Sequence, residues 1–342
     1  MNLYYLFRTF LFKLNPEHAH QLTLRLMKLA GDIQPVNALI RSVFSAPDHP
    51  VQAFGLNYSN PIGLAAGYDK DGIGWRGLAS LGFGHIEIGT VTLKPQPGNP
   101  QPRLFRLPKE RGLINRMGFP GMGAEFVVKQ ISKPRPTDLV LGVNIGKNKD
   151  TPLETAAQDY LSLLRLFANL ADYLTVNISS PNTVGLRQLQ ERQALDQLLK
   201  QLREERERIT KTGTREVPIL IKLSPDLTDP QLDDALDVIL ANQMEGVIAT
   251  NTTLSREGVN SPLAREDGGL SGRPLRLRSL AMVTKVNERT NGRIPVIGVG
   301  GISDATGIQR MMDAGAVLVQ IYTGLIYEGP GLVKKILHEL KS

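Results

Sequence analysis

The stretch YLTVNISSPNTVGLR, residues 173–187, decides the fold because an apolar run passes directly into a polar loop. This arrangement is typical of a buried strand that opens into a functional loop. Asn177 and Asn182 carry amides that donate and accept hydrogen bonds, and Ser179 and Ser180 add hydroxyls. Together they suit a flat, uncharged ring edge that alternates C=O and N–H groups. Asn, Ser and Pro also form ordinary turns, so this loop alone leaves a plain turn open.

The same pattern of strand and polar loop recurs along the chain. The candidate strands are 62–66, 85–89, 139–144, 173–177, 219–223, 246–250, 295–299 and 317–322. Amphipathic segments such as 153–169, 188–209 and 230–241 lie between them and predict helices. Apolar strands that alternate with helices indicate parallel β/α units, and about eight such units close into a (β/α)8 TIM barrel. An open doubly wound sheet is the alternative, but no Gly-x-Gly-x-x-Gly follows the first strand.

The chain divides into a predicted helical extension, residues 1–48, and a predicted barrel domain, residues 49–342. Segment 1–14 is rich in Leu and aromatic residues, and Asn15-Pro16-Glu17 is typical of the start of a second helix. Two short apolar helices with a few cations suit a membrane interface, and a helical pair packed on the barrel is the other interpretation. Residues 51–58 predict a small hairpin, and the proline-rich segment 92–107 predicts an insertion that ends in a hairpin strand.

Composition limits the classes of function. The 342 residues include no Cys, which excludes disulfides and thiolate metal sites. The net charge of +7 suggests anionic partners such as nucleic acid or anionic lipid. The cations of 187–216 alternate with acids, however, as on a solvated helix face. We therefore expect no nucleic-acid surface. No run reaches the roughly 18 apolar residues of a membrane span, and no signal peptide is expected. None of the five His residues falls at the carboxyl end of a predicted strand, and no His, Asp and Glu residues have metal-ligand spacing, so neither a catalytic metal nor a Ser-His-Asp triad is expected.

Polar groups gather at the carboxyl ends of the predicted strands, which open on one face of a barrel. Lys70 and Lys222 are expected to converge on this mouth with few acids beside them there, and this implies a bound anion. Gly298-Val-Gly-Gly301 precedes a helix start at 303–304, and glycine amides and a helix N-terminus both favour a phosphate. Barrels often hold a phosphate after strands seven and eight. We expect a phosphorylated cofactor whose reactive end lies over the barrel.

Several motifs, taken in order, resemble the dihydroorotate dehydrogenase family. They are AGYDK (66–70), NRMGF (115–119), NISSPN (177–182), IKL (221–223), TNT (250–252), GGLSG (268–272) and VGG (299–301). The resemblance covers nearly the whole chain. The helical extension and a Ser at the base position are similar to the quinone-linked, membrane-associated class 2 enzymes, whereas the class 1 enzymes use Cys and lack this extension.

The resemblance implies FMN at the barrel mouth and oxidation of dihydroorotate to orotate, the fourth step of pyrimidine synthesis, with a membrane quinone as acceptor. The residues that it assigns to FMN are Ala66, Gly67, Thr90, Asn144, Asn177, Lys222, Thr250, Gly272, Gly301, Tyr322 and Thr323. Those that it assigns to the substrate are Lys70, Asn115, Arg116, Met117, Gly118, Phe119, Asn177, Asn182, Asn251 and Thr252. Ser180 is the implied base. It must pass its proton on, through water or a hydroxyl such as that of Thr183.

The resemblance also implies a peripheral protein on the cytoplasmic side of the inner membrane, bound to anionic lipid through its extension. Arg8, His20 and Arg106 are candidates to line a quinone tunnel, and three surface cations are the alternative. Monomer and homodimer both stay open. Two positions depart from the family: Tyr68 stands where Leu is frequent, and Val184 replaces a frequent Pro. Rival interpretations are another FMN barrel such as a hydroxy-acid oxidase, a phosphate-binding isomerase or lyase, and a membrane adaptor with an inactive barrel.

Overall fold

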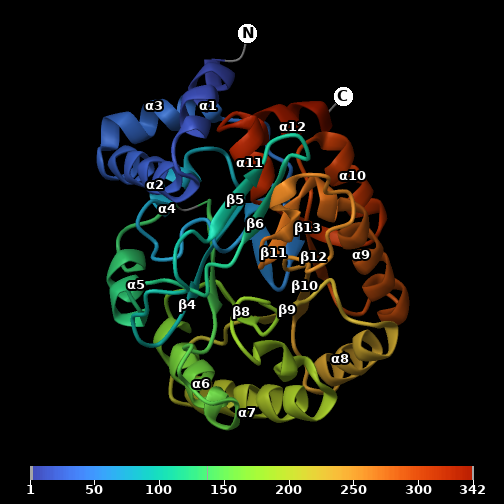
Figure 1. Ribbon diagram of the computed structural model, residues 1–342. Coiled ribbons are helices and arrows are strands. Elements are labelled where there is room, and N and C mark those ends of the chain that lie inside the picture. The colour runs from blue at the N-terminus through green and yellow to red at the C-terminus, as the bar shows by residue number, and fades with distance from the viewer. Residues whose placement is uncertain (1–2, 137, 341–342) are drawn as a thin grey trace.

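Parallel strands form a closed barrel in the computed structural model, which describes residues 3–136 and 138–340 (Figure 1). Neighbours around the barrel follow the order of the chain, β3-β4-β7-β8-β9-β10-β12-β13. The strands are β3 (Ile62–Leu64), β4 (His85–Val91), β7 (Val140–Ile145), β8 (Tyr173–Asn177), β9 (Ile219–Leu223), β10 (Gly246–Ala249), β12 (Val296–Val299) and β13 (Ala316–Ile321). The predicted TIM barrel and its eight strands are confirmed, and the open sheet is excluded.

Helices surround the barrel. They are α4 (Trp75–Ala79), α5 (Ala124–Ile131), α6 (Ala156–Phe167), α7 (Arg192–Lys211), α8 (Asp229–Ala241), α9 (Arg276–Thr290), α10 (Ala305–Asp313), α11 (Thr323–Glu328) and α12 (Leu332–Leu340). The helix expected at 188–209 is divided, because Glu191 has an extended backbone between the 3₁₀ turn Leu186–Gln190 and α7. At α8 the local sequence sets the start, since Thr228 and Gln231 form a capping box.

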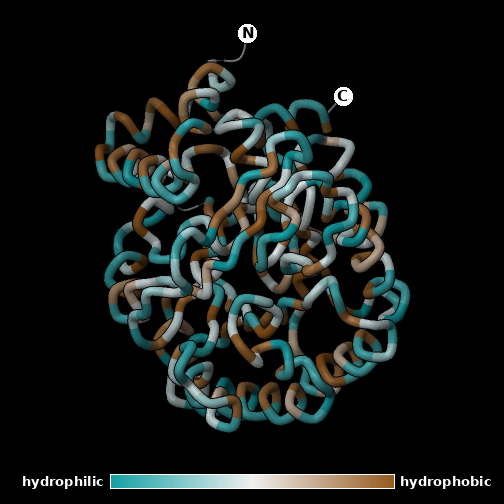
Figure 2. The backbone as a smooth tube through the Cα atoms, in the orientation of Figure 1, coloured by the Kyte–Doolittle hydropathy of each residue, from teal (hydrophilic) through white to brown (hydrophobic). Residues whose placement is uncertain are grey.

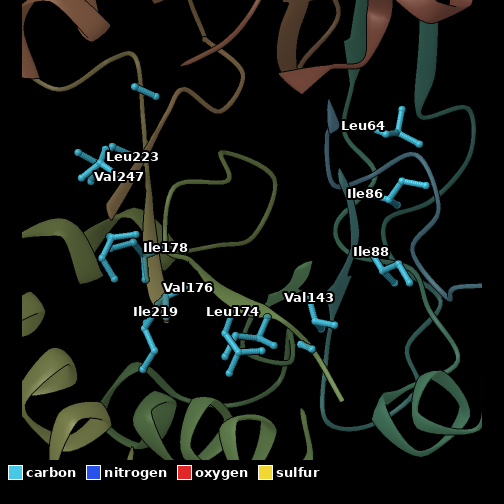
Figure 3. Close-up of a cluster of buried hydrophobic side chains, with 14 of the residues drawn as sticks. Leu64, Ile86, Ile88, Val143, Leu174, Val176, Ile178, Ile219, Leu223 and Val247 are labelled. Carbon is cyan, nitrogen blue, oxygen red and sulfur yellow. The ribbon is translucent and has the colours of Figure 1, made fainter. Parts of the chain in front are cut away.

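Side chains of the barrel strands alternate between two cores, as the two-residue period of a strand requires. Outward residues such as Ile86, Ile88 and Val143 pack against the surrounding helices (Figure 3). Inward residues such as Leu220 and Ile297 fill the amino-terminal end of the barrel. The predicted hairpin, β1 (Val51–Ala53) and β2 (Leu56–Tyr58), is confirmed and packs on this inner core.

Three helices precede the barrel, whereas the sequence predicted two. They are α1 (Leu3–Lys13), α2 (Pro16–Asp32) and α3 (Gln34–Phe44), and they lie together at the upper left of Figure 1. Asn15 caps α2 as predicted and accepts from the N–H of Glu17 at 2.9 Å. The prediction missed α3, which begins next to Pro35. Within the described ranges, no helix combines the length and apolarity needed to cross a bilayer. The domain boundary at 48/49 stays a prediction.

A small antiparallel sheet lies at the carboxyl end of the barrel. It consists of β5 (Leu104–Leu107), β6 (Gly112–Asn115) and β11 (Gly269–Gly272). The predicted hairpin strand in 92–107 is confirmed as β5. The pairing of β6 with β11 sets Asn115 opposite Gly269, so two motifs far apart in the sequence meet at this sheet.

Candidate active site

A cavity opens at the carboxyl ends of the barrel strands, with about 960 Å³ of empty space that includes its opening to solvent. Nearly all of the predicted site residues line it: Ala66, Gly67, Lys70, Thr90, Asn115, Met117, Gly118, Phe119, Asn177, Ser180, Asn182, Lys222, Thr250, Asn251, Thr252, Gly272, Gly301, Tyr322 and Thr323. The barrel thus brings together residues that lie more than 250 positions apart in the chain, as Ala66 and Tyr322 do. Their ligands stay a prediction.

Of the residues assigned to FMN, the substrate and the base, Asn144 and Arg116 do not line this cavity. Asn144 lies just behind it, where its Oδ1 accepts from Thr90 Oγ1 at 2.6 Å. Arg116 is turned away: its Nη1 lies 2.7 Å from Glu266 Oε2, and its guanidinium stacks 4.7 Å from the centre of the Phe105 ring. The side chain of Arg116 is therefore a structural link between loops. A motif cannot indicate this difference, because neighbouring residues on an irregular loop point in different directions.

Asparagine amides of three segments form two hydrogen-bonded groups at the cavity. Asn251 Nδ2 donates to Asn177 Oδ1 at 3.2 Å, and Asn177 Nδ2 donates to Thr90 Oγ1 at 2.8 Å. On the other side, Asn182 Nδ2 donates to Asn115 Oδ1 at 3.2 Å. The plain-turn interpretation of the 177–182 loop does not explain an amide array of this kind. The array can offer both donors and acceptors to a planar ring.

Ser180 lies at the cavity wall with its side chain buried, and its Oγ accepts from the N–H of Asn182 at 3.3 Å. Thr183 is also buried, three residues further along the same loop. Within the part of the chain that the structure describes, the Ser180 hydroxyl donates to no acceptor, so its proton can be directed toward a ligand.

The expectation that few acids accompany the two lysines is wrong for Lys222. Its Nζ lies 3.8 Å from Oε1 of Glu87, a carboxylate with no exposed surface. Burial lowers the pKa of Lys222, and the charge of Glu87 opposes this effect. Lys222 thus has a partner inside the protein, and its presence alone does not indicate a bound anion.

Lys70 carries the stronger indication of an anionic ligand. Its Nζ donates to the carbonyl of Gly67 at 2.6 Å, and no salt bridge joins it to a carboxylate within the described ranges. Burial lowers its pKa to about 8, while the charge of Asp71 acts in the opposite direction. A carboxylate beside Lys70 would raise this pKa and further favour the charged form.

The glycine loop after β12 has the features of an anion cradle. Gly300 and Gly301 line the cavity with φ of +136° and +69°. Among the described residues, their N–H groups have no hydrogen-bond partner. The start of the following helix, α10, was also expected to favour a phosphate. In the structure the side chain of Asp304 caps this helix and accepts from the N–H of Gly307 at 2.6 Å. The glycine amides, and not the start of α10, are thus the groups available to a phosphate.

A second cavity lies between the N-terminal helices and the barrel, with about 530 Å³ of empty space. His20 and Arg106 line it, whereas Arg8 does not. Arg8 and Arg106 are not free surface cations, because they donate to the carbonyls of Tyr327 and Leu14 at 2.7 and 2.6 Å. Burial and the charge of Lys70 lower the pKa of His20 to about 3, so its ring is neutral.

Tyr322 lines both cavities. The ring of Tyr68 packs edge-on between His20 and Tyr322, at centroid distances of 5.2 and 5.6 Å. Tyr68 therefore forms part of the wall between the two cavities, which is more than the change in packing that its departure from the family suggested. Val184, the other departure, is 89% exposed.

The sequence interpretation missed Glu87 and Gln320. Glu87 follows the pattern Ile-Glu-Ile in a strand, so the two-residue period could have placed it inside the barrel. Gln320 lies on β13, lines the cavity and is fully buried. Among the described residues, His, Cys, Asp and Glu form no cluster of three that could hold a metal ion.

The fold and this cavity define the protein as a (β/α)8-barrel enzyme. The family described as dihydroorotate dehydrogenase matches residues 50–342. The chain therefore belongs to the dihydroorotate dehydrogenase family, whose members are oxidoreductases. The resemblance predicted from its motifs is confirmed, and membership excludes the hydroxy-acid oxidase and the isomerase or lyase.

Relatives match almost the whole chain. "Dihydroorotate dehydrogenase (quinone)" of Paraburkholderia phymatum is 50% identical over 340 residues, 99% of this chain and 98% of the relative. The protein of the same name in Cellvibrio japonicus is 48% identical over 327 residues, 95% and 94% of the two chains. A crystal structure of ligand-free DHODH from Eimeria tenella has a TM-score of 0.86 at 37% identity and covers 95% of this chain and 94% of its own.

Proposed function

We propose that this protein oxidises dihydroorotate to orotate, with FMN as cofactor and a membrane quinone as electron acceptor. The observation that carries the proposal is a single cavity that combines an asparagine array, Ser180, Lys70 and a glycine cradle. The quinone in the names of full-length relatives supports the choice of acceptor. The choice of dihydroorotate as the substrate follows from the family to which the chain belongs and from its class of reaction.

The residues present fit FMN. Two buried polar atoms at the cavity, Thr252 Oγ1 and Gln320 Oε1, have no hydrogen-bond partner among the described residues and could bind a polar ring. A Cβ at Gly301 would lie 2.6 Å from Cβ of Arg276, so this loop keeps its backbone open only as glycine. Gly300, Gly301 and Thr323 would hold the phosphate, and Thr90, Asn177 and Lys222 the ring system. When bound, FMN supplies a two-electron acceptor that can later be reoxidised.

The chain's own residues would orient the substrate and remove its proton. The amides of Asn115, Asn177, Asn182 and Asn251 complement the C=O and N–H edge of the dihydroorotate ring. The ammonium of Lys70 offsets the substrate carboxylate. Ser180 takes a proton from the ring carbon next to the one that is oxidised, and it passes that proton on through water or Thr183. Arg116 supports the loop and does not contact the ring.

The N-terminal helices would supply the entrance for the quinone. Hydrophobic residues are frequent along these helices, as the brown segments at the upper left of Figure 2 show. Several of their large apolar side chains are exposed. They include Leu6, Phe10, Leu26, Leu29, Ile33, Leu39 and Val43. Such helices suit attachment to the surface of an anionic membrane, here the cytoplasmic face of the inner membrane. The second cavity leads from them to Tyr322 at the barrel mouth.

The test is to follow the flavin spectrum of the purified protein without oxygen. We expect a yellow protein whose flavin absorption is bleached by dihydroorotate and restored by a quinone. Lactate, a simple hydroxy acid, is the matched control and should leave the absorption unchanged. A colourless protein, or a flavin that dihydroorotate cannot reduce, would refute the proposal.

A further inference from the structure

Glu87 is a buried carboxylate with an unusually complete set of donors. It lies on β4 inside the barrel and has no exposed surface. Asn144 Nδ2 donates to its Oε1 at 2.9 Å. Its Oε2 accepts from Tyr173 Oη at 3.1 Å, Thr175 Oγ1 at 3.1 Å and Gln320 Nε2 at 2.9 Å. Four neutral groups from three other strands therefore converge on one carboxylate.

Donors reach both carboxylate oxygens of Glu87. The amides of Asn144 and Gln320 can only donate through their nitrogens, so each carboxylate oxygen must accept at least one hydrogen bond. Burial raises the pKa of Tyr173 well above its usual value, and the charge of Glu87 raises it further, so Tyr173 stays a neutral donor. The other titratable groups of the barrel interior are His85 and Tyr58. Burial lowers the pKa of His85 to about 3, which leaves it uncharged.

Lys222 is the cation that faces this carboxylate. Its Nζ lies 3.8 Å from Glu87 Oε1, and within the described ranges no other acid forms a salt bridge with it. Lys222 lines the cavity, whereas Glu87 lies behind it and does not. Without the carboxylate, a lysine buried to this degree would lose much of its tendency to hold a proton.

We infer that Glu87 is a positioning residue of the proposed reaction, which keeps Lys222 protonated at the wall of the cofactor site and holds Asn144 in place. The inference rests on the proposed function, because Lys222 can act on FMN only if FMN binds in this cavity. A charged Lys222 would favour the reduced cofactor, which carries more negative charge than the oxidised one.

Hydrogen bonding alone does not require a charge at position 87. A Gln there could face Tyr173 and Thr175 with its NH₂ group, because both hydroxyls can rotate to accept. Gln320 could then flip its amide and accept from the Tyr173 hydroxyl, which lies 3.3 Å from its Nε2. Its Oε1 has no partner at present among the described residues. The property that a Gln cannot supply is the negative charge beside Lys222, although burying such a charge is costly. This contrast makes Glu87→Gln an informative variant.

The test measures the midpoint potential of the bound flavin in Glu87→Gln. Removal of a negative charge by itself would make the potential more positive. If Lys222 loses its proton as we infer, the potential instead becomes more negative, by at least about 30 mV for a tenfold loss in relative affinity for the reduced form. Lowering the pH should reprotonate Lys222 and recover the difference. Glu87→Asp, which keeps the charge, should show a smaller shift.

A double variant separates the two residues. In a Lys222→Met background, Glu87→Gln should cause no further negative shift. A positive or absent shift in the single variant, or an equal negative shift in both backgrounds, would overturn the inference. If Glu87→Gln fails to fold, the midpoint potential of the wild-type flavin is measured from pH 6 to 9. An ionisation in this range that Lys222→Arg abolishes would show that Lys222 loses its proton, which contradicts the inference. A potential without such an ionisation would support a permanently charged Lys222.

Different results would overturn this inference and the proposed function. A flavin that dihydroorotate reduces, with a potential unaffected by Glu87→Gln, would overturn only the role of Glu87. A protein that binds no flavin would overturn both.

Discussion

Arg103 and Glu17 form a buried ion pair that ties the proline-rich insertion to α2. Arg103 Nη2 lies 2.7 Å from Glu17 Oε1, and both side chains are only 9% exposed. Arg103 Nη1 also donates to the carbonyl of Asn99 at 2.8 Å, and Asn99 Nδ2 donates to the carbonyl of Asn182 at 3.1 Å. A continuous set of polar contacts therefore joins the N-terminal helices to the 177–182 loop.

Glu17→Gln should destabilise the protein by about 3 kcal/mol, because it leaves Arg103 buried without its counter-charge. Urea unfolding followed by circular dichroism measures this change. Asp234→Asn is the matched control, since Asp234 pairs with Arg192 at the exposed surface and its loss should have little effect. Equal unfolding midpoints for the two variants would contradict the importance of burial.

The same pair predicts a dependence of stability on pH. Burial alone would raise the pKa of Glu17, but hydrogen bonds and the charge of Arg103 outweigh it, so the pKa lies below its usual value. The stabilisation is thus present above the unfolded pKa of roughly 4.3 and is lost as the pH falls through the lower folded pKa. Glu17→Gln should lack this part of the acid transition.

Ser180→Ala should slow the reduction of flavin by dihydroorotate roughly a hundredfold or more, because it removes the proposed base. Flavin content should stay the same, and quinone should reoxidise chemically reduced flavin at the normal rate. Stopped-flow absorbance measures both half-reactions. Ser180→Cys, which retains an ionisable group, should recover part of the rate. A parallel loss of FMN and activity in Ser180→Ala would contradict the assignment.

Lys70 predicts a decline of kcat/KM for dihydroorotate at alkaline pH. Burial lowers its pKa to about 8, so above this pH the free enzyme increasingly presents a neutral amine to the substrate carboxylate. The pH profile of kcat/KM reports the free enzyme and should fall above about 8. Lys70→Arg remains charged across this range and should move the decline to higher pH. An identical profile in Lys70→Arg would exclude Lys70 as its origin.

Ala19→Phe should obstruct the second cavity, which Ala19 lines from α2. We expect quinone to reoxidise the flavin roughly tenfold more slowly, while dihydroorotate reduces it at the normal rate. Leu22→Phe on the same helix is the control, because Leu22 is 37% exposed and its added volume extends into solvent. Normal quinone turnover in Ala19→Phe would argue against this cavity as the route.

Leu39→Asp should weaken binding to phospholipid vesicles roughly tenfold, since it replaces an apolar contact with a charge on the outer face of α3. Cosedimentation with anionic vesicles measures the bound fraction. Leu277→Asp makes the same change at a leucine that is 74% exposed on α9 and should bind normally. Equal loss in both variants would indicate a general charge effect and no specific membrane face.

The pattern of apolar runs and polar loops predicted the barrel more completely than any other part of the structure. Each strand is a short apolar run followed by a polar loop. This signal is local, so it can be read without knowing which strands are neighbours in the sheet. Tertiary contacts limit what such a pattern can predict. The sequence interpretation missed the helix α3. It also did not indicate that the side chain of Arg116 pairs with Glu266, or that Arg8 lies outside the cavity that His20 and Arg106 line. The direction of these two side chains depends on a surface supplied by another segment.

The amino-acid sequence determined three things: the (β/α)8 architecture, the family, and which end of the barrel carries the polar groups. Periodicity and motif order are properties of the chain itself. The tertiary structure alone decided which of those groups act together. It set Glu87 beside Lys222 across the barrel, turned Arg116 outward and placed Tyr322 between two cavities. These relationships depend on the closure of the sheet, which brings distant strands within a few ångströms and takes their charges out of water.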